Sequence, residues 1–116
     1  MIGHVAIEVR EEDVGACVRF WALLGFAHVE VPPALAARST WVQAGPTQIH
    51  LLYADEPVVP AEGHVAVVVG DYGATLGALR EAGFEPQPRR EYWDSPRAFV
   101  RSPSGHRVEL MAAAPA

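Results

Sequence analysis

Four residues of the types that bind metal ions recur at matched points of a duplicated sequence pattern. His4 stands in Gly-His-Val-Ala-Ile-Glu-Val, and His64 stands in Gly-His-Val-Ala-Val-Val-Val. The segment around His50 parallels the segment around Glu109 with a similar offset, about 59 residues. A constant offset indicates two copies of one supersecondary unit. Each copy therefore contributes one pair of imidazole or carboxylate groups, which form a metal site when they converge from rigid elements.

The surrounding residues predict the elements that must position these side chains. Residues 4–10 and 64–69 alternate between apolar and mixed positions, which is typical of strands with one buried face. A helix is expected after each strand, over 13–24 and 72–82, with Asp13 and Asp71 as N-caps and Gly25 and Gly83 just past the ends. Three short strands should follow each helix, at about 26–31, 39–43, 48–53, 84–88, 97–101 and 107–111. The expected fold class is α+β, with two tandem β-α-β-β-β modules.

The length predicts a single domain over residues 1–116. Module 1 is expected at about 1–54, a proline-stiffened linker at about 55–62 and module 2 at about 63–112. If a pseudo-twofold axis relates the modules, the four ligand positions meet around that axis. Gln48 lies two residues before His50 and shares its strand face, so a register shift of two would make Gln48 the inward group.

Three neutral imidazoles and one carboxylate would leave a divalent ion with a net charge of about +1, which suits the polarisation of a carbonyl group. This set of ligands fits Zn, Ni, Co, Fe or Mn.

Composition narrows the classes of partner. The net charge of −5 argues against nucleic acid, since phosphate binding needs a basic surface. No apolar run approaches the roughly 20 residues that span a bilayer, and no signal-peptide pattern opens the chain, so we expect a cytoplasmic protein without a membrane partner. The absence of lysine excludes a Schiff-base mechanism. Cys17 is the only cysteine and is expected to be a small buried residue. The abundance of alanine and arginine suggests a GC-rich bacterial genome.

The chain resembles the vicinal oxygen chelate superfamily, which groups glyoxalases, bleomycin resistance proteins and extradiol dioxygenases. The matching elements are the segments around His4, His50 and His64, and the run Ser102-Pro-Ser-Gly-His-Arg-Val-Glu-Leu110, which is similar to the family's Asp-Pro-Asp-Gly-x-x-x-Glu-Leu ending. The resemblance covers essentially the whole chain. It implies a half-open barrel of paired modules around a metal ion, often completed by two chains, so a homodimer is expected.

Carried over by that resemblance, His4, His50, His64 and Glu109 fall on the four metal positions of the glyoxalase-like members. The implied function is a metal-dependent lyase or isomerase that polarises a small oxygenated substrate, with Glu109 and His50 as the catalytic residues. Glyoxalase I commonly has a glutamate where this chain has His50, and this departure puts glyoxalase I activity itself in doubt.

Three further residues are candidates for contact with a small-molecule substrate or drug. Arg97 suits the recognition of a carboxylate or phosphate, and Trp41 and Trp93 suit an aromatic pocket. The structural alternatives are a solvated Arg97, a Trp41 packed in the core and a Trp93 that anchors its loop.

Two other functions compete with the lyase. An extradiol-type dioxygenase would use His4, His64 and Glu109 as a facial triad for Fe(II). A bleomycin-resistance-like protein would bind a drug without a catalytic metal, and its aromatic side chains would dominate the site. A fourth protein ligand at His50 favours the lyase over the dioxygenase.

Overall fold

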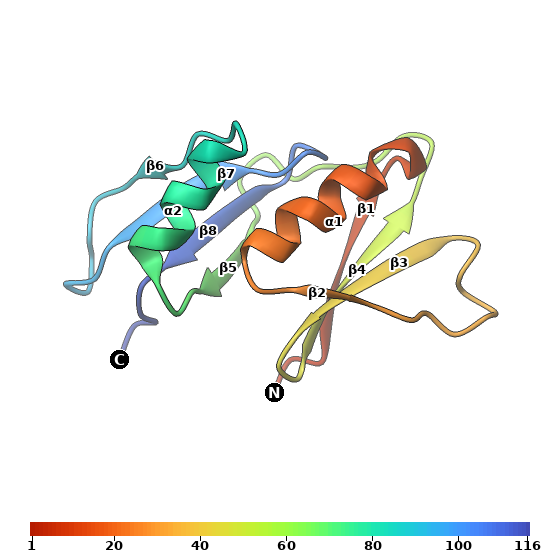
Figure 1. Cartoon of the computed structure of the whole chain (residues 1–116), viewed down its shortest axis with the longest axis horizontal. Helices are drawn as coiled ribbons and strands as arrows, with labels where there is room; N and C mark the ends of the chain where they lie inside the picture. The colour runs from red at the N-terminus through yellow and green to blue at the C-terminus, as the bar shows by residue number, and fades with distance from the viewer. The chain divides into compact units, whose positions relative to one another are not determined.

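The computed structural model describes all 116 residues and divides them into two compact units, Met1–Val59 and Pro60–Ala116. Each unit contains one helix and one four-stranded sheet (Figure 1). The first comprises β1 (His4–Val9), a 3-10 turn (Glu11–Asp13), α1 (Val14–Leu23), β2 (Ala27–Val29), β3 (Ser39–Ala44) and β4 (Thr47–Tyr53). The second comprises β5 (Val65–Val68), α2 (Tyr72–Glu81), β6 (Gln87–Pro88), β7 (Arg97–Arg101) and β8 (Arg107–Met111). The predicted α+β class and the two β-α-β-β-β modules are confirmed.

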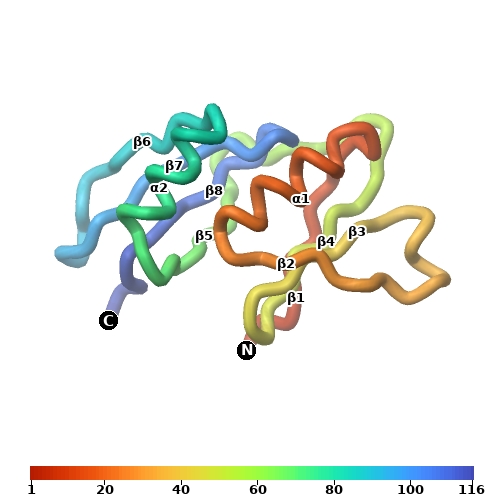
Figure 2. The backbone as a smooth tube through the Cα atoms, in the orientation of Figure 1, coloured from red at the N-terminus to blue at the C-terminus, as the bar shows by residue number.

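The two sheets share one topology. Their strand orders are β1-β4-β3-β2 and β5-β8-β7-β6, so the last strand of each unit lies beside the first (Figure 2). That pair is parallel in both units, and the remaining pairs are antiparallel. Neither sheet closes into a barrel on its own. The parallel pairing places the two candidate ligands of each unit on neighbouring strands.

Each helix buries its apolar residues against one face of its own sheet. In the first unit Phe20 and Trp21 are almost completely buried, and Trp21 meets both Phe20 and Phe26 edge to face. In the second unit Leu76 and Leu79 provide the buried side of α2. Cys17 is fully buried, as predicted. Since strand residues alternate between faces, burying one face against the helix leaves the other face for polar side chains.

The ends of the two helices were predicted with unequal success. Asp71 caps α2, because its carboxylate accepts a hydrogen bond of 3.0 Å from the Ala74 amide. The prediction that Asp13 caps α1 is wrong: Asp13 has helical dihedrals, makes no capping bond and ends a 3-10 turn. Gly25 and Gly83 both follow their helices with φ of +92°, the left-handed conformation that glycine adopts without strain.

One strand is shorter than expected. β6 is limited to Gln87–Pro88, since the prolines of the expected 84–88 strand have no N–H for a sheet ladder. After β8, Ala112 N donates to Pro96 O, and Trp93 Nε1 donates to Ala113 O. No helix combines the length and apolar character that crossing a membrane would require.

Candidate functional site

In the first unit three rings stack on the sheet face that points away from α1. His4 opens β1, His50 lies in β4 and Trp41 lies opposite His50 in β3. The His4 and His50 ring centroids are 4.0 Å apart, and those of His50 and Trp41 are 3.9 Å apart with an interplanar angle of 2°. His50 is thereby enclosed on both faces and is only 8% exposed. The stack fixes the plane of the His50 ring and leaves its edge to interact.

A relay of two glutamine side chains reaches that edge. Gln43 Nε2 donates to the Gly45 carbonyl at 2.9 Å, and Gln48 Nε2 donates to Gln43 Oε1 at 2.8 Å. Gln48 Oε1 lies 2.7 Å from His50 Nε2. A backbone carbonyl can only accept, so the direction of every bond in the relay follows from Gly45. The relay therefore ends on an amide oxygen that requires a hydrogen on His50 Nε2.

The relay leaves the other nitrogen of His50 as the atom with a free lone pair. Burial, and secondly the nearby His4, lower the pKa of His50 below its ordinary value, which favours the neutral ring. In a neutral ring protonated at Nε2, the acceptor atom is Nδ1. Both ring nitrogens of histidine serve as metal ligands in proteins. Both ends of the Gln48 amide are already used, so the contacts favour His50 over Gln48 as a ligand.

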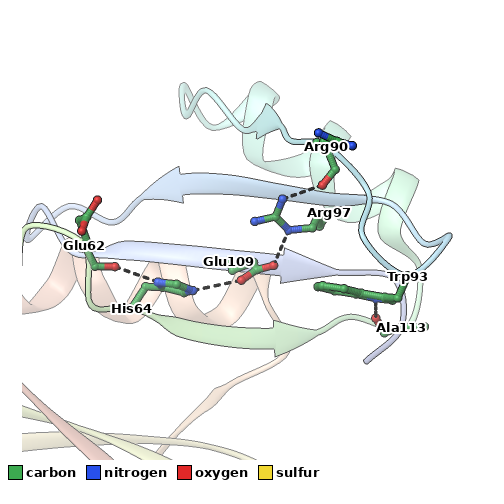
Figure 3. A network of polar contacts seen from close by, with 7 residues as sticks. All are labelled: Glu62, His64, Arg90, Trp93, Arg97, Glu109 and Ala113. Carbon is green, nitrogen blue, oxygen red and sulfur yellow. Dashed lines mark hydrogen bonds and ion pairs between the residues drawn. The ribbon is translucent and has the colours of Figure 1, made fainter. Parts of the chain in front are cut away.

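In the second unit His64 and Glu109 lie side by side, as Figure 3 shows. His64 Nδ1 is 2.9 Å from the Glu62 carbonyl oxygen, which can only accept, so Nδ1 carries a hydrogen. His64 Nε2 is 3.0 Å from Glu109 Oε1. In the neutral ring Nε2 is an acceptor, and it then faces a carboxylate oxygen that is also an acceptor. The contact is satisfied when a proton or another cation lies between the two atoms.

A single arginine holds the far side of the Glu109 carboxylate. Arg97 Nε donates to Glu109 Oε2 at 2.8 Å, and Arg97 Nη1 donates to the Arg90 carbonyl at 2.7 Å (Figure 3). The two side chains of the ion pair are only 12% and 8% exposed. A carboxylate that accepts a charge-assisted bond in such a buried place has little rotational freedom. Arg97 thus orients Glu109 so that Oε1 faces His64.

The donor chemistry of the second unit fits part of a metal site. His64 Nε2 and Glu109 Oε1 lie 3.0 Å apart, so both atoms would be able to bind one ion. The Glu62 carbonyl supplies the acceptor that metal-binding histidines commonly use to fix their second nitrogen. Neither unit by itself gathers three His, Cys, Asp or Glu side chains.

The three candidate substrate residues all make contacts within the protein. Trp41 stacks on His50. Arg97 is bonded to Glu109 and to the Arg90 carbonyl. Trp93 donates its N–H to the Ala113 carbonyl. These contacts do not test whether a substrate also touches these residues, so that role stays a prediction.

Sequence analysis named Gln48 and Arg97 but did not predict that they support the candidate ligands. The bonds from Arg97 to Glu109 and from Gln48 to Gln43 run across neighbouring strands, and they depend on strand register. One signal was available in the sequence. Gln48 lies on the same strand face as His50, and Arg97 lies on the same strand face as Phe99. Only the register of β3 with β4 and of β7 with β8 turns such a pattern into named pairs.

Comparison with known proteins places the chain in a broad context. Residues 1–110 match the family model described as Glyoxalase/Bleomycin resistance protein/Dioxygenase superfamily. No curated protein sequence matches the chain.

Many solved structures share the fold. A glyoxalase family protein from Bacillus anthracis matches with a TM-score of 0.85 and 23% identity, over 96% of this chain and 93% of that one. The lactoylglutathione lyase of Agrobacterium tumefaciens matches with 0.73 and 16%, over 96% and 92%. The fosfomycin resistance protein FosX of Mesorhizobium loti matches with 0.76 and 14%, over 98% and 92%. At these identities the likeness establishes the fold alone.

Proposed function

Because this chain belongs to the glyoxalase/bleomycin resistance protein/dioxygenase superfamily, we propose that it is a metal-dependent enzyme of the lyase or isomerase type. It acts on a small oxygenated substrate, and its ligands are His4, His50, His64 and Glu109. A bound Zn, Ni, Co, Fe or Mn ion would supply a Lewis acid that polarises a substrate carbonyl. The solved structures that share the fold include proteins named as a lyase, a fosfomycin resistance protein and an oxidase.

The observation that carries the proposal is the contact between His64 and Glu109. His64 Nε2 and Glu109 Oε1 lie 3.0 Å apart, and each side chain is held in place from behind, by the Glu62 carbonyl and by Arg97. A pair that was purely structural would need only a proton between its two atoms. A pair that is fixed by supporting contacts on both sides is typical of metal ligands.

The protein's own groups would then divide the chemistry. The Glu109 carboxylate can accept a proton from a substrate carbon at Oε1, while Arg97 keeps the group oriented through Oε2. His50, neutral in its buried stack, can act as a ligand or exchange a proton through Nδ1. Trp41 keeps the imidazole in one plane.

The test is metal content measured by elemental mass spectrometry, after incubation with each candidate ion and removal of the excess. We expect near-stoichiometric metal in the wild type and loss of at least tenfold in affinity for His64→Ala and Glu109→Gln, as removal of a ligand implies. His28→Ala, an exposed histidine outside the proposed set, serves as the control. Absence of bound metal under every condition would move the assignment to a drug-binding protein.

A mixing experiment tests the expected homodimer. One variant lacks His4 and His50, and the other lacks His64 and Glu109. If each site draws its two ligand pairs from two chains, unfolding and refolding the variants together restores metal binding in part. If both pairs come from one chain, mixing restores nothing, and a strict monomer in gel filtration would contradict the dimer.

A further inference from the structure

The second unit contains a cavity of about 390 Å³ beside the ring of Phe99. Its walls come from the segment after α2 and from the ends of β6, β7 and β8. Three arginines line it, namely Arg89, Arg101 and Arg107, and Glu85 is the only acidic residue among the lining side chains. This volume lies within the range of small-molecule pockets, which is roughly 300–1,000 Å³.

None of these three arginines is neutralised by a carboxylate. The ion pairs of the protein are His64 with Glu109 and Arg97 with Glu109. Arg101 donates only to the Gly105 carbonyl, and Arg89 donates to the Gln87 amide at 3.4 Å. The cavity therefore carries a surplus of positive charge in a chain whose net charge is −5. Such a surplus attracts anions.

The ring of Phe99 contacts two of these arginines. The guanidinium carbon of Arg107 lies 4.1 Å from the ring centroid, and that of Arg89 lies 5.7 Å from it. A guanidinium that stacks on a ring uses its flat face, so the N–H donors along its edge stay available for an anion. Arg107 makes no hydrogen bond to the protein that would occupy those donors. Its position is thus fixed while its donors remain free.

The same ring connects the cavity to the candidate ligands. Phe99 lies opposite Glu109 in the β7–β8 ladder, and its ring meets the His64 ring edge to face at 5.1 Å. Arg97 also approaches the ring, with its guanidinium carbon 5.2 Å from the centroid, although it is bonded to Glu109. Phe99 therefore contacts both the cavity and the ring of His64.

From these contacts we propose that the cavity binds a small organic anion. Its carboxylate or phosphoryl group is held by Arg101 and Arg107, with Arg89 also lining the cavity, and its apolar part lies against Phe84 and Phe99. The identification of this anion as the substrate rests on the proposed function, whereas the binding site itself does not.

The experiment uses metal-free protein and three ring compounds of similar size. Phenylphosphonate and benzoate carry the two candidate anionic groups, and benzyl alcohol is the neutral control. Amide chemical shifts follow each titration by NMR. We expect saturable shifts at Phe99, Arg101 and Arg107 with one or both anions, and none of comparable affinity with benzyl alcohol. The tighter anion identifies the preferred group.

Two variants show whether the arginines are responsible. Arg107→Gln should weaken anion binding about tenfold or more, the loss expected for one charge-assisted hydrogen bond. If Arg107→Gln fails to fold, Arg89→Gln tests the loss of anion binding at another, exposed arginine of the cavity. Arg80→Gln, the same charge change on α2 outside the cavity, should leave binding unchanged.

Equal binding of benzyl alcohol, or equal effects of the cavity and control variants, would overturn the proposal. So would the absence of saturable shifts with either anion. Anion binding by a protein that never retains metal would keep this site and reject the proposed function. Retained metal without anion binding would do the reverse.

Discussion

The two units place different chemistry on the same backbone plan. Trp41 lies opposite His50 in the first sheet, and Phe99 lies opposite Glu109 at the matching point of the second. Two positions further along, Gln43 and Gln48 face each other in one unit, and Arg101 and Arg107 face each other in the other. The second unit holds six of the nine arginines.

The difference shows how each unit supports its candidate ligands. A neutral imidazole needs an enclosed place and a defined tautomer, which a ring stack and an amide relay provide. A buried carboxylate needs a counter-charge, which Arg97 provides. Duplication thus fixed the positions of the side chains, while the substituted residues determined the charge at each position.

The largest expected effect comes from removing the carboxylate of Glu109 in the second unit. Glu109→Leu leaves Arg97 nearly buried without its partner and should destabilise the protein by about 3 kcal/mol. His50→Leu, at the matching position, should cost clearly less, since no charge is left unpaired. Urea unfolding of the metal-free proteins measures both.

The double variant Arg97→Met/Glu109→Leu sharpens this result. Removing both charges should recover much of the lost stability, because an apolar pair often replaces a buried ion pair at little cost. A double variant as unstable as the sum of the single variants would show that the ion pair does not explain the loss.

A smaller effect is expected from disrupting the stack of His4, His50 and Trp41 in the first unit. Trp41→Leu removes the ring that covers one face of His50 and should cost about 1.5 kcal/mol, somewhat more than a typical aromatic pair contributes. Phe99→Leu is the matched change in the second unit. It should also loosen Arg107, so that salt affects the stability of this variant less than that of the wild type. Equal salt dependence in both proteins would argue against a role of the ring in holding the guanidinium.

The amide relay should contribute less. Gln48→Leu removes the acceptor of His50 Nε2 and should cost about 1 kcal/mol. The decisive reading is the pair of ¹⁵N chemical shifts of His50, which report where the proton lies. We expect a ring protonated at Nε2 in the wild type and a mixture of tautomers in Gln48→Leu. An unchanged tautomer would show that the stack alone positions the proton.

The smallest expected effect is the contribution of His50 to the loss of stability at acidic pH. The folded pKa of His50 is lowered, mainly by burial, so the unfolded chain binds a proton at this residue more readily. The contribution to stability is complete above the unfolded pKa, about 6.5, and is lost as the pH falls below it. In metal-free protein, His50→Gln should therefore lose less stability between pH 7 and pH 5 than the wild type. His28→Gln, at an exposed histidine, should behave like the wild type.

Local patterns predicted the elements and the faces of the strands. Asp71 and the two terminal glycines follow from residue type alone, and period-two alternation correctly placed Gln48 and His50 on one face. The Asp13 cap failed because a 3-10 turn preceded the helix, and short local signals do not separate a turn from a cap.

The sequence could not identify which side chains contact each other across neighbouring strands. Arg97 was named as a candidate for substrate contact, and that role stays a prediction. The sequence did not indicate that its guanidinium bonds to Glu109, which lies two positions from its register partner Met111. Such diagonal contacts depend on the twist and register of the finished sheet. Residue types therefore indicated the candidate ligands, while only the fold identified what orients them.

The glutamine relay begins at the hairpin turn before β4, where Gly45 adopts φ of +55°. The carbonyl of that turn sets the direction of the bonds that end on His50. Exchanging the turn for one from a related protein would therefore change more than a loop: it would alter which nitrogen of a distant imidazole offers its electrons. Designers who graft hairpins onto this scaffold should treat the turn as part of the chemistry it borders.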